Sequence, residues 1–243
     1  MIKATASKTP GVPLKSHRLA WVDALRGLAI VLMIIFHFCY DLRYFGYVNW
    51  NVPNGPNWWP FRYLILSLFI FTLGISLSLA HKKKFKPSAF VKRLLQLIVA
   101  SLAITAMSLV VFPQAWIYFG ILHFMTAASL VGIVFVKRPV IALALGLLIL
   151  SGYWLGIVNS RWPFEWFSGF LPRRTEDFVP LFPWLGVMLL GVGLAGVLPI
   201  ATFSLPKAEQ FKALIYLGKH GLIIYLIHQP ILFAGFLLVK LLT

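Results

Sequence analysis

Cysteine and acidic residues are scarce in this sequence. Cys39 is the only cysteine in 243 residues, which excludes an intramolecular disulfide framework and a structural zinc site with cysteine ligands. Only 6 residues are acidic against 22 lysines and arginines, and charged residues make up 12% of the chain. A soluble domain has about 25% charged residues. The composition therefore excludes an ordinary soluble protein.

Hydrophobic residues dominate what is present. They make up 60% of the chain, and the mean hydropathy is +0.87. The formal net charge of +16 raises the question of nucleic-acid binding, but the basic residues are clustered between apolar stretches. That pattern is typical of the positive-inside rule and not of a phosphate-binding face. We therefore expect the lipid bilayer as the partner, and no nucleic acid.

Seven apolar stretches are close to the length of about 20 residues that a bilayer requires. They lie at about residues 21–45, 60–80, 91–112, 115–136, 139–158, 180–198 and 219–242. The sequence thus predicts an all-α, polytopic transmembrane helix bundle with about seven spanning helices. A single transmembrane domain is expected over residues 19–243.

The basic residues also predict the orientation. Most of them lie in residues 1–18, 82–93, 137–138 and 207–219, which fall on one side of the seven predicted spans. The positive-inside rule makes that side cytoplasmic. Residues 1–18 have no apolar core followed by a cleavage site. We interpret them as a cytoplasmic basic tail, so the N-terminus is predicted to be cytoplasmic.

Four ionisable residues share one face of the first predicted helix. At about 100° per residue, Asp23, Arg26, His37 and Asp41 fall within roughly 60° of arc, and His37 lies about 15–17 Å beyond Arg26 along the axis. Ionisable groups at that depth mark a site that faces a protein or water-filled interior. A simpler alternative is that the histidine only hydrogen-bonds to a neighbouring helix.

The types and spacing of these residues predict acid–base chemistry. Asp41, four residues after His37, is placed to reach the imidazole ring and to hold one tautomer. Such a pair can deprotonate an acceptor or receive an acyl group. Arg26 is a candidate for binding a phosphate-bearing ligand, and Asp23 is either part of that site or only the ion-pair partner of Arg26.

Two connections on the outer side are rich in aromatic residues, over 47–60 and 161–178. They are explained either by an interfacial aromatic belt or by a mouth that binds substrate. Charged residues near the end of the second connection favour the mouth: Arg173, Arg174, Glu176 and Asp177. Asp177 is alternatively the N-cap of the sixth predicted helix.

Two further histidines lie inside predicted spans. They are His123 in the fourth span and His228 in the last, where Gln229 and Pro230 follow. A proline inside a membrane helix is tolerated where neighbours or cavity water satisfy the backbone. We therefore expect His228 and Gln229 to line an interior and, with His123, to bind substrate. No metal site is predicted.

Four segments resemble one known family in their order along the chain. RGLAIVLMIIFHFCYDL, GILHFMTAASL, DFVPLFPWLGVMLLG and YLIHQPIL are similar to the heparan-alpha-glucosaminide N-acetyltransferase catalytic-domain family of bacterial membrane proteins, over residues 18–235. The first segment also resembles the acyltransferase-3 proteins of the same superfamily, in which an arginine, ten residues and a histidine recur. Arg26 and His37 match that spacing.

The resemblance implies transfer of an acyl group, most simply acetyl, from cytoplasmic acyl-CoA to an extracytoplasmic sugar or glycan. It implies that His37 acts as base or acyl carrier and that Arg26 meets the CoA phosphates. It also implies a multi-pass protein of a bacterial inner membrane. The lysosomal relatives have a histidine before their second helix that PNGPNWWPF lacks, which removes direct support for a glucosamine acceptor. The chain also has fewer candidate spans than its relatives, so a partner subunit or a homodimer is expected to complete the site.

Two other function classes stay open at this point. Mid-membrane His, Asp and Arg groups are also typical of a small proton-coupled transporter. A b-type haem protein is the second alternative, with His37 and either His123 or His228 as axial ligands.

Overall fold

The computed structural model describes residues 19–242, and the predicted cytoplasmic tail 1–18 lies outside them. This part of the chain is all-helical, with no strand. The helices are α1 (Ala20–Tyr44), α2 (Trp58–His81), α3 (Pro87–Val111), α4 (Ile121–Phe135), α5 (Pro139–Trp154), α6 (Trp184–Val197), α7 (Lys212–Lys219) and α8 (Gly221–Leu242). Three short 3-10 helices lie at Phe164–Phe167, Ile200–Thr202 and Ala208–Phe211. The predicted all-α class is confirmed.

Four of these helices are long and apolar enough to cross a membrane: α1, α2, α3 and α8. The three other predicted spans are shorter apolar helices, α4, α5 and α6, with 15, 16 and 14 residues. Prolines shorten two of them, because α5 begins at Pro139 and α6 begins directly after Pro183. The count of about seven spans therefore stays a prediction.

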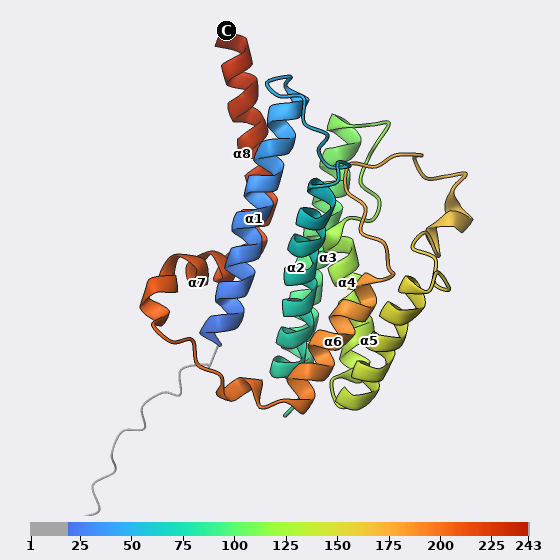
Figure 1. The fold of residues 1–243 in the computed structure, drawn as a ribbon, viewed down its shortest axis with the longest axis vertical. Helices are drawn as coiled ribbons and strands as arrows, with labels where there is room; N and C mark the ends of the chain where they lie inside the picture. The colour runs from blue at the N-terminus through green and yellow to red at the C-terminus, as the bar shows by residue number, and fades with distance from the viewer. Residues whose placement is uncertain (1–18, 243) are drawn as a thin grey trace, which may run out of the picture.

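The helices run up and down, so that the connections gather at two ends (Figure 1). Connections 82–86, 136–138 and 198–211 lie at the end where α1 begins, which we call the basic end. Connections 45–57, 112–120 and 155–183 lie toward the other end, the loop end. The lysines of the predicted cytoplasmic side that fall in these connections thus share one end. Which side of a membrane that end faces remains a prediction.

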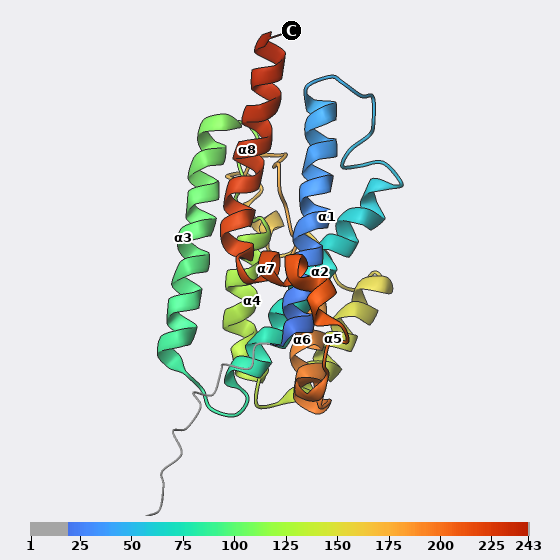
Figure 2. The same ribbon diagram turned by 90° about the vertical axis from the view of Figure 1, so that its left-hand side faces the viewer.

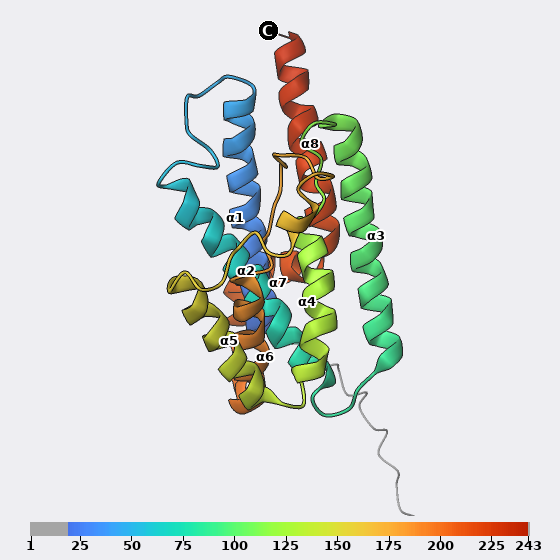
Figure 3. The same cartoon turned by 90° about the vertical axis from the view of Figure 1, so that its right-hand side faces the viewer.

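Helices α2, α5 and α6 form the most closely packed part of the bundle. A Cβ on Gly74 would lie 2.2 Å from the carbonyl oxygen of Met188, and one on Gly191 would lie 2.4 Å from that of Phe71. The backbones of α2 and α6 therefore touch, which only glycine permits. The glycines of α6 thus serve close packing. Helices α5 and α6 lie toward one edge of the bundle and α3 stands at the opposite edge (Figures 2 and 3).

Helix α7 crosses α1 at a second backbone contact. A Cβ on Gly27 would lie 1.9 Å from the carbonyl oxygen of Leu214, and one on Gly218 would lie 1.9 Å from that of Asp23. The chain turns directly after this crossing and continues as α8, which rises beside α1 to the loop end (Figure 1). The position of α8 relative to α1 therefore depends on this crossing.

Candidate active site

A cavity of about 920 Å³ lies between the loop-end halves of α1, α2 and α3 and the middle of α8. Its wall is largely apolar, with Met33, Phe36, Phe69, Met107 and Phe233 among the side chains. The polar side chains that line it are His37, Tyr40, Arg43, Asn54, Arg62, Ser108, Arg174, Thr175, Glu176, Asp177, Tyr225, His228 and Gln229. The arrangement fits a ligand site, in which an apolar wall surrounds a few polar groups.

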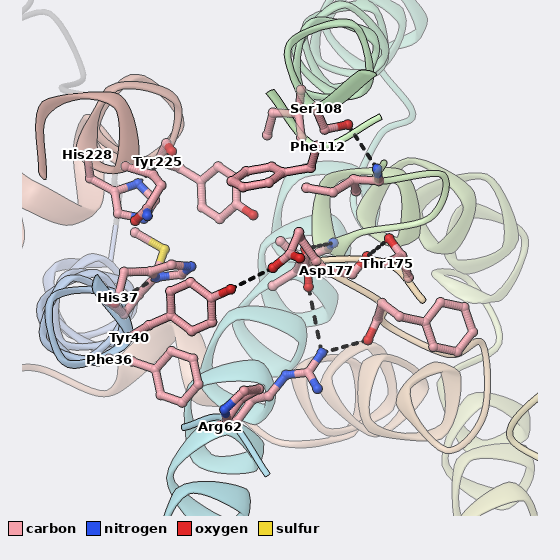
Figure 4. A pocket seen from close by; sticks show the side chains of 18 of the residues that line it. Phe36, His37, Tyr40, Arg62, Ser108, Phe112, Thr175, Asp177, Tyr225 and His228 are labelled. Atoms are coloured by element: carbon pink, nitrogen blue, oxygen red, sulfur yellow. Dashed lines mark hydrogen bonds and ion pairs between the residues drawn. The ribbon is translucent and has the colours of Figure 1, made fainter. Parts of the chain in front are cut away.

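Two imidazoles meet in this cavity. The ring centroids of His37 and His228 are 4.8 Å apart, with an angle of 76° between the planes (Figure 4). Nδ1 of His37 lies 2.9 Å from the carbonyl oxygen of Met33, and Nδ1 of His228 lies 2.7 Å from that of Tyr225. A carbonyl oxygen only accepts, so each Nδ1 carries the proton and donates it. In the neutral rings, both Nε2 atoms therefore keep a lone pair for a proton or an acyl group.

Asp41 does not contact His37 as predicted. The aspartate is fully buried, and its Oδ1 accepts a hydrogen bond of 2.8 Å from Nε2 of Gln229, while its Oδ2 has no partner. The prediction that Asp41 holds the ring of His37 is wrong, because the carbonyl of Met33, one turn earlier in α1, occupies Nδ1. Asp41 instead joins α1 to α8 one residue after His228, which holds the two imidazoles at the same depth.

The mouth of the cavity holds two acid–base contacts that the sequence did not indicate. The hydroxyl of Tyr40 donates to Glu176 at 2.7 Å. The guanidinium of Arg62 lies 3.7 Å from Oδ1 of Asp177 and donates to the carbonyl oxygen of Phe178 at 2.7 Å. Figure 4 shows Arg62 and Asp177 across the cavity from His228. Arg62 had one signal in the sequence, since it is an arginine inside an apolar stretch.

Asp177 is a helix cap, but of α4. Its Oδ2 accepts a hydrogen bond of 3.0 Å from the backbone N–H of Ile121, the first residue of α4. Helix α6, which the sequence predicted it to cap, begins seven residues later at Trp184 after Pro183. A Cβ on Gly120 would lie 2.5 Å from the same carboxylate oxygen, so only glycine leaves room for the cap.

This cap gives a prediction for stability. Asp177→Ala removes the acceptor at the N-terminus of α4, and loss of an N-cap costs about 1 kcal/mol. For a chain of this length we expect the midpoint of thermal unfolding to fall by about 2–4 °C. Asp177→Asn is the matched control, because it retains an oxygen that can accept from Ile121, and it should lose less than half as much. An equal loss in both variants would contradict the cap.

The other predicted substrate-binding residues divide into two groups. His228, Gln229, Arg174 and Asp177 line the cavity, whereas His123 and Arg173 do not. His123 is instead held beside α3, with Nε2 3.0 Å from the hydroxyl of Thr105 and Nδ1 accepting from the N–H of Gly120 at 3.3 Å. The structure thus gives His123 a role in joining α3 to α4. The tryptophans of the two aromatic connections also lie outside the lining.

A comparison with protein families identifies the family of the chain. The model of the family described as heparan-alpha-glucosaminide N-acetyltransferase, catalytic, matches residues 18–230, most of the chain. The chain belongs to this family. Comparisons with curated proteins and with solved structures give no match. Membership of the family, together with the four long apolar helices, identifies a membrane acetyltransferase.

The arginine that matches the superfamily spacing does not line the cavity. Arg26 donates to Oδ1 of Asp23 at 2.9 Å, to the hydroxyl of Ser76 at 2.7 Å and to the carbonyl oxygen of Gly218 at 3.4 Å. The guanidinium thus joins α1 to α2 and to the C-terminus of α7, where a cation is favourable. The simpler alternative, that Asp23 is the ion-pair partner of Arg26, is confirmed. Donor binding by these two residues stays a prediction.

Buried apolar side chains follow the cavity lining toward the basic end of α1, α2 and α3. The innermost lining residues of α1, α2 and α3 are Met33, Phe69 and Ala103. Toward the basic end, the fully buried side chains of Ile30, Ile70 and Leu97 follow. In the described residues the cavity therefore has no lining residue near the basic end. The cavity that holds His37 therefore does not extend to Arg26.

The geometry of the histidines also contradicts the alternative that this protein binds a b-type haem. Metal–imidazole bonds are about 2.0–2.1 Å long, so axial rings stand on opposite sides of a metal. His37 and His228 contact each other directly at 4.8 Å between centroids, which leaves no space for a macrocycle. His123, the other predicted partner, has both ring nitrogens engaged outside the cavity.

Proposed function

We propose that this membrane acetyltransferase transfers the acetyl group of acetyl-CoA to a sugar or glycan on the extracytoplasmic side, with His37 as the base. The family description supports an amino group as the acceptor atom, as on a hexosamine. The single observation that carries the proposal is the pair of imidazoles in the cavity, each with Nδ1 on a carbonyl, of which His37 keeps Nε2 for chemistry.

The proposed reaction balances with these two histidines. The acceptor nitrogen attacks the thioester carbonyl, so that a C–N bond forms and the C–S bond breaks. Nε2 of His37 takes the proton that the nitrogen loses, and the departing thiolate then receives a proton from an imidazolium. In the form with an acyl carrier, Nε2 of His37 holds the acetyl group between two such transfers. Trapping of a labelled acetyl-enzyme without acceptor distinguishes the two forms.

The mouth of the cavity supports binding of polar groups of both substrates. Arg43, Arg62 and Arg174 bring guanidinium groups that suit phosphate, and Glu176 and Asp177 bring carboxylates that suit hydroxyl or ammonium groups. The cavity in this structure is reached from the loop end. Delivery of acetyl-CoA from the cytoplasm, which the resemblance implies, requires that the layer of Ile30, Ile70 and Leu97 opens.

Acetyl transfer by the purified protein tests the proposal directly. The protein is reconstituted in nanodiscs, which expose both faces, and supplied with acetyl-CoA labelled in the acetyl group and with methyl glucosaminide. We expect label in N-acetylated sugar and one free thiol released per acetyl group. Matched reactions with methyl glucoside, which lacks the amine, should give at most a tenth of the product. No transfer to sugars at saturating acetyl-CoA, in a protein that remains folded, would overturn the proposal.

A further inference from the structure

The cavity opens through the side of the bundle, between α3 and α8, as well as toward the loop end. Ala103 and Met107 on α3 and Pro230 on α8 line the cavity and are also exposed at the surface of the protein. Met107 has an exposed fraction of 38%. Helices α3 and α8 stand side by side along this part of the bundle (Figures 2 and 3). Side chains that belong to both a cavity wall and the outer surface mark an opening, which we call the side window.

The side window has defined upper and lower limits. Toward the loop end, the rings of Phe112 and Phe233 approach each other from α3 and α8, with centroids 6.5 Å apart and planes at 90°. Toward the basic end, Leu97 and Ala100 of α3 belong to a buried apolar cluster against which Leu226 of α8 packs. The Phe112–Phe233 contact thus bounds the window toward the loop end, and this apolar cluster bounds it toward the basic end.

The depth of the window places it against lipid. Met107 and Ala103 lie four and eight residues before the end of α3 at Val111, which is about 6 and 12 Å along the axis. Both α3 and α8 are long and apolar enough to span the hydrocarbon core, which is about 30 Å thick. A molecule that enters through this gap therefore comes from the acyl-chain region of the bilayer and not from water.

The window also lies at the depth of the histidine pair. Pro230, on its α8 side, is two residues after His228, and His37 lies against that histidine. A substrate whose polar head reaches His37 can thus leave its alkyl chain in the window. The polar groups of the cavity, such as Tyr40 and Arg62, lie on the side of the head, and Met107 and Phe233 lie on the side of the chain.

From these positions we infer that the acceptor is an amphiphile, a sugar joined to a lipid chain, which enters the cavity laterally between α3 and α8. The inference rests on the proposed function for the nature of the head group. It adds that the substrate is anchored in the bilayer, which a soluble glycan is not. It assigns Ala103, Met107 and Pro230 to contact with the chain.

Photolabelling tests this inference without the need for turnover. The probe is an alkyl glucosaminide whose 12-carbon chain carries a diazirine, added to the protein in phosphatidylcholine nanodiscs. We expect labelled peptides from residues 103–112 and 225–233, and at least a fivefold loss of label with excess dodecyl glucosaminide. Excess dodecanol, which has the chain alone, should compete far less.

Two tryptophan variants provide the matched comparison. Ala103→Trp fills the window and should lower the competed labelling at least fivefold, whereas Leu102→Trp, at an exposed neighbour outside the cavity lining, should leave it unchanged. Labelling that is spread over the outer faces of α3 and α8, without competition, would overturn lateral entry. So would equal labelling in the two variants.

The outcome is separate from that of the proposed function. Labelling requires no acetyl-CoA. Competed labelling of the window without acetyl transfer would therefore support lateral entry and contradict the proposed reaction. Acetylation of methyl glucosaminide with only uncompeted labelling would support the proposed reaction and contradict lateral entry. In active protein, Ala103→Trp should raise KM for dodecyl glucosaminide at least tenfold more than it raises KM for methyl glucosaminide, and Leu102→Trp should leave both KM values unchanged.

Discussion

Replacement of His37 by alanine is expected to lower the rate of acetyl transfer at least 100-fold. A positioned general base contributes about 10²–10⁴ to a rate, and His37 is the imidazole of α1 whose Nε2 remains for chemistry in the cavity. The measurement is the initial rate of labelled product with acetyl-CoA and methyl glucosaminide, in protein whose thermal midpoint is recorded alongside. His37→Gln, which keeps a polar side chain without a base, should be equally slow.

His220→Ala is the matched control for this experiment. Its Nδ1 also lies 2.9 Å from a carbonyl four residues earlier, that of Tyr216, but the ring is exposed and outside the cavity lining. It should keep the rate within about twofold. The rate of His228→Ala should lie between the rates of His37→Ala and His220→Ala, because it removes the second imidazole of the cavity but leaves that of His37. If His37→Ala keeps more than a third of the wild-type rate, the assignment of His37 as the base is wrong.

Gly218→Ala is expected to have the largest effect on stability. The added methyl would lie 1.9 Å from the carbonyl oxygen of Asp23, so α7 must move away from α1 by more than 1 Å. Overpacking costs about 1–3 kcal/mol even where side chains can yield, and here both surfaces are backbone. A loss near 3 kcal/mol corresponds to a fall of about 6–12 °C in the midpoint of thermal unfolding.

The activity of this variant should fall as well, because α8 follows α7 directly and carries His228. Gly235→Ala in α8 is the control, since no atom lies within 4 Å of its added methyl group. Gly235→Ala should leave the thermal midpoint unchanged or raise it slightly, because alanine favours a helix by about 1 kcal/mol relative to glycine. A thermal midpoint of Gly218→Ala within 2 °C of that control would contradict the backbone crossing.

The sequence predicted the helical class and much of the site's content. Periodicity and depth were enough to place His37 and His228 in an interior, because an ionisable side chain in lipid is costly wherever the helix packs. These inferences depend on local pattern and on the surrounding medium, both of which a single sequence contains.

Partners between helices were harder to predict, since they depend on rotation and register. Asp41 lies one helical turn after His37 in the sequence, yet its carboxylate accepts a hydrogen bond from the amide of Gln229 on α8. Asp177 had the composition of a cap, but a connection that folds back beside residues 115–119 brings it to α4. Periodicity along one helix contains no information on which neighbour supplies the competing donor.

The apolar layer below the histidines has a consequence for the cell that houses the enzyme. A row of titratable groups deep in a bilayer would, if it were wetted from both faces, discharge the electrochemical gradient of protons. Toward the basic end, the titratable side chains of the cavity are followed by Ile30, Ile70 and Leu97, whose side chains have no lone pair that can bind a proton. Such buried apolar side chains therefore separate the bases of the cavity from the basic end of the bundle.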